Sequence, residues 1–250
     1  MREAERGQGR GSDRLRPDRW SVRNRVTGSF GDWARSILVA LILFLVIRTS
    51  VVEAFKIPTS SMEGTLLVGD FLLVNKVVYG ARIPGTDLVL PALSEPERGD
   101  VIVFHPPHEP EKNYVKRVVG VAADTLEMRE KQLYLNGAPV HEPYARYVDG
   151  RGDAVHPDMK WQSHHLIAGP PPGYEPTRDN WGPIVVPQGR YFVLGDNRDN
   201  SEDSRYWGFV LRDQVRGRPW MVYYSFEAPV AAPISWASTV RWARLGTGIR

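Results

Sequence analysis

An uninterrupted apolar run, ILVALILFLVI from Ile37 to Ile47, constrains the fold of this chain more than any other feature of the sequence. Widened to Trp33–Phe55, the segment has 23 residues, which as a helix reach about 34 Å and can cross a bilayer. The run alone would rise only about 16 Å, too little to span. The wider segment contains Arg48, which would have to extend its side chain to the far headgroups. We therefore predict a transmembrane helix over 36–54.

The distribution of charge supports an oriented anchor. Residues 1–35 hold nine arginines and five acidic residues, a charge of +4, whereas 36–250 hold 23 basic and 24 acidic residues, a charge of −1. Basic residues before a span stay in the cytoplasm. This predicts a basic cytoplasmic tail over 1–35 and an extracytoplasmic domain over 55–250. A nucleic-acid binder would carry its positive excess on the folded domain, so that class is excluded.

Two other interpretations of the apolar run remain open. Val52-Glu53-Ala54 has the small-residue character of a signal-peptide cleavage site, although a charged region of 35 residues before the run is unusually long for such a peptide. The run could also be a buried core helix, which the arginine-rich tail disfavours. We favour a retained anchor.

The sequence predicts β structure for the extracytoplasmic domain over 55–250, because short runs rich in β-branched and aromatic residues alternate with turn signals. Gly 23 and Pro 20 fit many short strands better than a helical bundle. Asn136-Gly137 has the chemistry of a two-residue hairpin turn. Between Pro139 and Pro183 the composition shifts to Pro, Gly, His and charge, so we predict a loop-rich inserted lobe over about 125–187. The predicted strands cover 71–74, 101–104, 114–121, 132–135, 184–186, 191–194 and 220–226.

Familiar catalytic and metal-binding signatures are missing. There are no cysteines, which excludes disulfides, thiolate metal sites and cysteine nucleophiles. The histidines at 105, 108, 164 and 165 lack the spacing and partners of a metal site. The acidic stretch 196–203 lacks the glycine and terminal glutamate of a calcium loop. We predict no metal and no cofactor.

A serine segment and a lysine-bearing strand stand out when they are read together. The segment Ile57–Met62 contains Ser61, and the strand 114–120 places Lys116 among apolar neighbours. A strand lysine often points to solvent. A buried one has a lowered pKa and can act as a general base, so a serine within hydrogen-bond reach would be activated without histidine.

Five ordered blocks carry a resemblance to a known family. They are Arg48–Leu66, Gly69–Lys76, Arg98–Phe104, Tyr114–Gly120 and Gly195–Gly208. In this order and spacing the chain resembles bacterial type I signal peptidases, membrane-anchored serine proteases that remove signal peptides from exported proteins. The resemblance covers about residues 36–227.

The resemblance implies roles for individual residues. Ser61 matches the nucleophile and Lys116 the general base. Thr59 matches the hydroxyl that joins the Ser61 N–H in the oxyanion site, and Ser201 matches the serine that orients the lysine. Asp203 and Arg205 resemble a supporting ion pair. The predicted substrate-binding residues around this dyad are Phe55, Ile57, Pro58, Met62, Leu66, Tyr114 and Val115.

Two departures from the family pattern accompany these matches. Gly64 stands where proline is common, and Ser60 where glycine or glutamate is frequent. Neither replaces a catalytic atom.

The resemblance also implies fold, activity and location. It implies a mainly β protein: one transmembrane helix, then a two-lobed, mostly antiparallel catalytic domain. The implied activity is cleavage of signal peptides from preproteins at the outer face of the cytoplasmic membrane, with the lipid bilayer and preproteins as partners. The alternative is a single-pass membrane protein whose exported β-rich module binds a partner without catalysis. Replacing Ser61 would separate the two.

Overall fold

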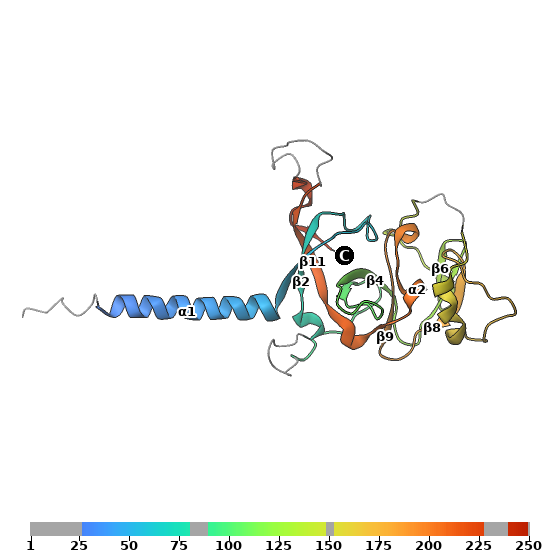
Figure 1. The fold of residues 1–250 in the computed structure, drawn as a ribbon, viewed down its shortest axis with the longest axis horizontal. Helices are drawn as coiled ribbons and strands as arrows, with labels where there is room; N and C mark the ends of the chain where they lie inside the picture. The colour runs from blue at the N-terminus through green and yellow to red at the C-terminus, as the bar shows by residue number, and fades with distance from the viewer. Residues whose placement is uncertain (1–26, 81–89, 149–152, 228–239, 250) are drawn as a thin grey trace, which may run out of the picture. The chain divides into compact units, whose positions relative to one another are not determined.

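The structure, a computed structural model, describes residues 27–80, 90–148, 153–227 and 240–249 of the chain (Figure 1). These residues form two units, which are divided between Phe44 and Leu45. Within these ranges the α-helices are α1 (Thr27–Ser50) and α2 (Ser204–Trp207). Short 3-10 helices are η2 (Val77–Tyr79), η3 (Pro157–His165), η4 (Arg198–Asn200), η5 (Arg212–Gln214) and η7 (Trp242–Arg244).

Helix α1 contains the whole apolar run but differs in its bounds from the helix expected over 36–54. It begins at Thr27 and ends at Ser50. Val52–Ala54 belong instead to β1, which pairs with β2 along its full length. Within the residues that the structure describes, no helix meets the combined length and hydropathy required of a membrane span.

The larger sheet of the second unit is antiparallel and has the order β1-β2-β11-β3-β4-β9-β10, with β12 added on β11. Its long strand β11 bends from β2 to β3, with register shifts near Met221 and Gly217. The seven strands on the main path and β12 are β1 (Val52–Lys56), β2 (Asp70–Asn75), β3 (Val101–Phe104), β4 (Tyr114–Gly120), β9 (Arg190–Leu194), β10 (Val210–Leu211), β11 (Val215–Ser225) and β12 (Thr247–Gly248).

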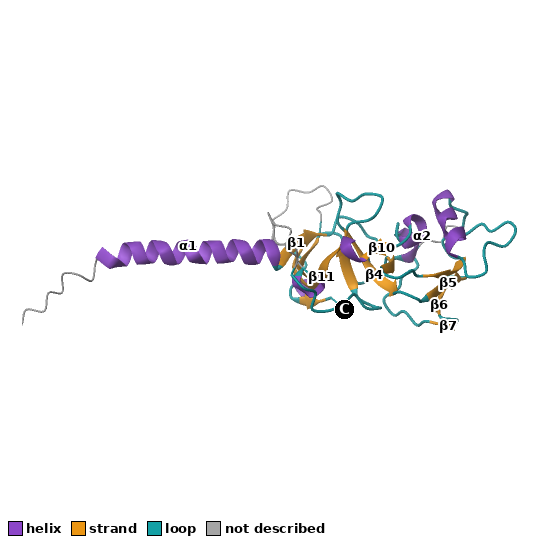
Figure 2. Ribbon diagram, turned by 90° about the horizontal axis from the view of Figure 1, so that it is seen from below, coloured by secondary structure: helices purple, strands orange, loops and turns teal. Residues whose placement is uncertain are grey.

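The smaller sheet is also antiparallel and has the order β7-β6-β5-β8. Figure 2 shows β5, β6 and β7 grouped together, apart from β1 and β11. The turn between β6 and β7 has positive φ at Asn136 and Gly137, as the hairpin prediction requires. The four strands are β5 (Thr125–Arg129), β6 (Gln132–Leu135), β7 (Ala138–Pro139) and β8 (Trp181–Val185). The mainly β, antiparallel class is therefore confirmed.

Three apolar clusters hold the β unit together. One surrounds the smaller sheet and includes Leu126 and Ile184. A second lies on the larger sheet around Ile102 and Val193. The third contains Leu66 and joins the segment after β1 to β2 and β3. This third cluster matters most for function, because it supports the backbone that carries Ser61.

Candidate active site

Ser61 and Lys116 lie in direct contact, although 55 residues separate them. Ser61 sits in the turn that follows β1, and Lys116 lies on β4 opposite Ile102 of β3. The Lys116 Nζ is 2.6 Å from the Ser61 Oγ. Because β4 is an inner strand between β3 and β9, the lysine side chain is enclosed, and its exposed fraction is 4%. The structure thus brings together the two residues that the sequence singled out.

Burial lowers the pKa of Lys116 from 10.5 to about 8. The main cause is desolvation, which penalises the ammonium form. Among nearby charges, Asp203 works in the opposite direction and Arg205 adds to the lowering. At pH 7 roughly one such lysine in ten is a neutral amine that can accept a proton, far more than for a free lysine.

The backbone of the nucleophile turn is fixed from both sides. The Thr65 and Leu66 N–H groups both donate to the Met62 carbonyl, which closes a tight turn after Ser61. From the other side, the Asn197 N–H donates to the Ser61 carbonyl at 3.0 Å. Asn197 lies in one of the five matching blocks, but nothing in its sequence position connects it with Ser61.

The hydroxyl of Ser60 has its own partner, since the Asn200 side-chain amide donates to it at 2.7 Å. The Asn197 side-chain amide also donates to the Ser60 carbonyl, at 3.3 Å. The residue before η4 and the last residue of η4 therefore bind the Ser60 carbonyl and hydroxyl, respectively. The departure from the family pattern at this position is accommodated by these hydrogen bonds.

Gly195 is required sterically where this segment meets the nucleophile turn. A Cβ on Gly195 would lie 2.2 Å from the Ser201 Oγ and 2.5 Å from the Ser61 carbonyl oxygen. Ser201 is buried, and its Oγ makes no hydrogen bond of standard geometry within the described residues. The glycine therefore lets Ser201 and Ser61 pack against one backbone position.

Asp203 and Arg205 form the buried ion pair that the resemblance implied. The Arg205 Nε donates to Asp203 Oδ1 at 2.8 Å and its Nη2 donates to Oδ2 at 2.9 Å. Burial alone would raise the pKa of Asp203, but the charge and hydrogen bonds of Arg205 hold it below its usual value. The Gly195 N–H also donates to Asp203 Oδ2. The pair thus anchors the glycine on which Ser61 packs.

A second buried ion pair ties β4 to the same region. Arg117, next to Lys116, donates to both carboxylate oxygens of Asp196 at 2.8 and 2.7 Å. The Thr65 hydroxyl donates to Asp196 Oδ2 at 2.5 Å and accepts from the Arg117 Nη2 at 3.1 Å. The nucleophile turn, the lysine strand and the segment after β9 therefore meet in one network. No feature of a single sequence reveals a pairing across 79 residues.

Thr59 lies beside Ser61. Its Oγ1 is 3.5 Å from the Ser61 Oγ, and the residue is exposed. A hydroxyl in this place can donate a hydrogen bond toward an atom bound at Ser61.

A groove with a volume of about 920 Å³ runs past the dyad. Ser61, Lys116 and Thr59 line it, as do six of the seven predicted substrate-binding residues: Phe55, Ile57, Pro58, Met62, Tyr114 and Val115. Leu66 does not. Its side chain is fully buried in the cluster beneath the turn, so the prediction that Leu66 contacts substrate has to be corrected to a supporting position.

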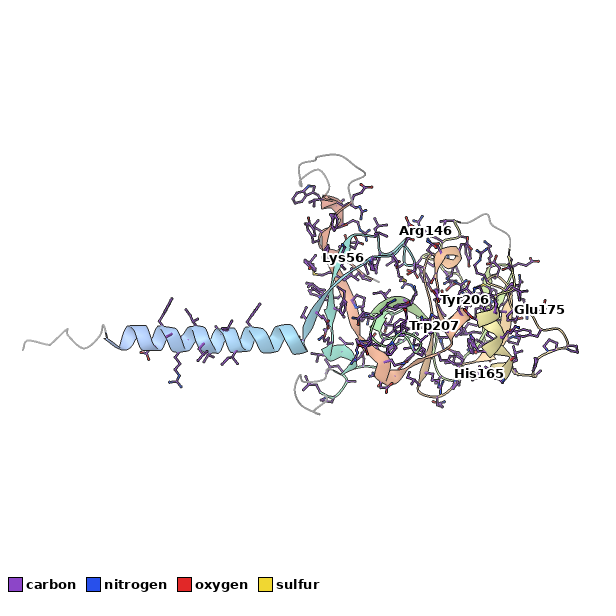
Figure 3. All side chains as sticks on the ribbon, in the orientation of Figure 1. Lys56, Arg146, His165, Glu175, Tyr206 and Trp207 are labelled. Atoms are coloured by element: carbon purple, nitrogen blue, oxygen red, sulfur yellow. The ribbon has the colours of Figure 1, made fainter. Side chains whose placement is uncertain are left out.

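The groove is also lined by residues that were not predicted from the sequence. His156 and Asp158 come from the region read as a loop-rich insertion, and Tyr206 comes from α2. The His156 ring packs edge-on against Tyr206, with centroids 5.0 Å apart. Figure 3 labels Tyr206 and its neighbour Trp207, which packs against His108 instead. Residues of the insertion thus line the same groove as Ser61 and Lys116.

Histidines and acidic residues do not gather into a metal site in the described part of the chain. The His108 ring stacks on Trp207, and His105 contacts the Pro110 carbonyl. That the protein needs no metal or cofactor stays a prediction.

Comparison with known proteins agrees with the resemblance noted in the sequence. The family model described as signal peptidase, peptidase S26, matches residues 30–224. A signal peptidase I of Pseudomonas aeruginosa is 41% identical over 213 residues, covering 79% of this chain and 74% of its own. One of Aquifex aeolicus is 32% identical over 231 residues, covering 79% and 85%.

A crystal structure of a signal peptidase I from Enterococcus faecalis is 31% identical and covers 50% of this chain and 97% of its own. Its TM-score is 0.34, so the family assignment rests on the sequence matches. The two sequence matches cover most of this chain and most of each relative. The chain belongs to the signal peptidase family, peptidase S26, a family of serine endopeptidases.

Proposed function

We propose that this protein cleaves signal peptides from exported preproteins, with Ser61 as nucleophile and Lys116 as general base. One observation carries the proposal: the buried Lys116 Nζ lies 2.6 Å from the Ser61 Oγ within a groove. Binding alone does not call for a buried amine beside a hydroxyl, whereas a serine protease without a catalytic histidine needs such a base to activate the hydroxyl.

In the first step, the neutral Lys116 amine accepts the Ser61 proton as the Oγ attacks the scissile carbonyl. Negative charge then develops on the carbonyl oxygen. The Thr59 hydroxyl, next to Ser61, and the Ser61 N–H are the donors that we assign to this oxygen. Donors fixed before the reaction stabilise such a charge without reorganising.

In the second step, the Lys116 ammonium donates its proton to the departing amine, and the acyl group remains on Ser61. Water then attacks the acyl carbon while Lys116 again accepts a proton, and that proton passes to the Ser61 Oγ as the ester bond breaks and the carboxylic acid product leaves. The Asp203 carboxylate favours the transient ammonium, since it is the strongest influence that raises the lysine pKa. Ser201, whose buried hydroxyl lacks a standard hydrogen bond, is the group that we assign to orienting the amine.

The groove fits a substrate with small side chains near the cut. Ile57, Met62 and Val115 give it apolar walls close to the dyad. Large side chains would clash with these walls, and charged ones would lose hydration without gaining a partner. Alanine-sized residues immediately before the cut and two positions further upstream fit best.

We also propose that α1 is a retained membrane anchor, with the basic tail in the cytoplasm and the catalytic unit outside. The apolar run Ile37–Ile47 lies wholly within this helix. Large apolar side chains on it are exposed to solvent within its own unit: Trp33, Ile37, Leu38, Val39, Leu41, Ile42 and Phe44. Lipid is a suitable environment for such a surface.

The proposed activity is tested by incubating the detergent-solubilised full chain with a secretory preprotein and identifying the products by mass spectrometry. We expect one cut after a small residue, and no cut by the Ser61→Ala variant. Cleavage by Ser61→Ala would contradict the assignment of the nucleophile. The same spectra report the mass of the protein itself. A mature chain that starts at Phe55 would contradict the retained anchor.

A further inference from the structure

The segment 240–249 returns to the loop that carries Ser61, although it lies beyond the residues 30–224 that the family model matches. We call this segment the C-terminal strap. It contains η7 and β12, and β12 pairs with β11 through Val222 and Met221. The Ile249 side chain is 9% exposed and joins the apolar cluster that contains Met62 and Leu66.

The loop over 57–70 is closed at its base by two backbone hydrogen bonds. The Ile57 N–H donates to the Asp70 carbonyl at 2.8 Å, and the Gly69 N–H donates to the Ile57 carbonyl at 2.9 Å. Ser61 lies within this closed loop. Any shift of Asp70 would therefore be transmitted to the backbone on which the nucleophile sits.

Asp70 is a fully buried carboxylate at this base. Its oxygens accept from the Leu67 N–H at 2.8 Å and from the Ser225 hydroxyl at 2.6 Å. Among the described residues, its ion pairs are with Arg244 and Arg241, and both arginines belong to the strap. A buried carboxylate that loses its cation is strongly unfavourable, so the loop depends on these arginines.

Arg244 contacts the loop at two places. Its Nε donates to Asp70 Oδ1 at 3.0 Å, while its Nη2 donates to Asp70 Oδ2 and, at 3.0 Å, to the Thr65 carbonyl. Thr65 in turn bonds Asp196 and Arg117 through its hydroxyl. One guanidinium thus links the loop base to the turn that follows Ser61.

We propose that Arg244 is a positioning residue for the nucleophile, holding the Ser61 loop in its reactive geometry by neutralising Asp70 and binding the Thr65 carbonyl. The C-terminal strap is then part of the catalytic unit. This inference rests on the proposed role of Ser61. Arg244 then affects the rate of cleavage, although it lies outside the five sequence blocks and does not line the groove.

The test compares Arg244→Gln with Arg218→Gln in the full chain, well below the melting temperature of both. Arg218 is a matched control, because it lies on β11, pairs with Asp100 at 2.8 Å and, among the described residues, has no ion pair with the loop. We expect Arg244→Gln to lower kcat on a preprotein substrate by about 10- to 100-fold, since small misplacements of reacting groups have effects of that order. The effect on KM should be smaller.

Two further readouts separate positioning from a general loss of folding. Amide hydrogen exchange in Arg244→Gln should accelerate within 57–70 and not in β4. Adding Asp70→Asn to Arg244→Gln removes the buried charge, which among the described residues would otherwise keep only Arg241 at 3.9 Å as its ion-pair partner, and should regain part of the lost kcat at a temperature where both variants are fully folded.

Equal kcat for Arg244→Gln and Arg218→Gln, or unchanged exchange within 57–70, would overturn the proposal. A wild-type chain that cleaves no preprotein would instead count against the proposed function. In that case the exchange comparison would still decide whether the strap holds the loop.

Discussion

Lys116→Met is expected to abolish cleavage and, at the same time, to stabilise the folded protein at pH 7. The loss should be at least roughly 10⁴-fold in kcat, because the amine is the only base assigned to the Ser61 hydroxyl. Combining it with Ser61→Ala should cause no further loss, since the two groups act as one unit. Substantial activity in Lys116→Met would contradict the dyad.

The gain in stability follows from the direction of the lysine pKa. Folding lowers this pKa from 10.5 to about 8, so the folded state binds fewer protons than the unfolded state between these values. Below pH 8 the buried ammonium therefore costs about 3 kcal/mol of stability, and the cost fades as the pH rises toward 10.5. Methionine has a similar shape without the charge.

Thermal unfolding measures this effect. Lys116→Met should melt several degrees above the wild type at pH 7, and the difference should shrink by about pH 10. Lys112→Met is the matched control, because Lys112 lines the same groove but its side chain is 63% exposed in a pair with Glu109. Its melting temperature should differ little from that of the wild type at either pH. A Lys116→Met variant that melts below the wild type at pH 7 would contradict the claim that the buried ammonium destabilises the folded protein.

Thr59→Val is expected to lower kcat by about 10²- to 10³-fold with little change in KM. Valine keeps the branched shape of threonine and removes only the hydroxyl, which lies 3.5 Å from the Ser61 Oγ. The hydroxyl acts on the charge that develops during the reaction, so its loss affects the transition state rather than substrate binding.

Steady-state kinetics on one peptide substrate would measure these values, with Thr59→Ser as the control. Serine restores a hydroxyl at the same position and should keep most of the activity. If Thr59→Val cleaves as fast as the wild type, the oxyanion is stabilised by other donors.

The strands could be predicted from the sequence where apolar and β-branched residues cluster. The run over 101–104 coincides with β3, and the run over 114–121 contains β4. β5 was missed, because Thr125–Arg129 mixes Glu and Met with only one branched apolar neighbour, and its pairing with β6 and β8 decides its conformation. Local preference is weak evidence where tertiary pairing dominates.

The C-terminal end of helix α1 was also not predictable from local sequence. Val51 and Val52 extend the apolar run in sequence, yet Val52 begins β1 because β2 offers a complete antiparallel partner. Leu66 was placed in the groove on its apolar character alone, which cannot distinguish a wall residue from the core beneath it. Hydrophobic character predicts that a side chain is buried, but it does not predict whether that side chain faces the groove or the core.

The dyad itself was predictable only through resemblance. A lysine in an apolar strand and a serine 55 residues earlier have no local signal that joins them. The supporting contacts join residues that lie even farther apart in the sequence, such as Arg244 and Asp70, which are 174 residues apart. Such pairs arise from sheet topology, which brings β2, β4, β9 and β11 into one layer.

The pH dependence of kcat/KM tests the central claim most directly, which is that a neutral buried lysine activates Ser61. It should be measured on a peptide substrate from about pH 6 to 10.5, with protein stability checked at each pH. Only the neutral amine can accept a proton, so the rate should rise with pH and level off above an apparent pKa near 8. A rate that keeps rising to about pH 10.5, the range of a free lysine, would contradict the claim.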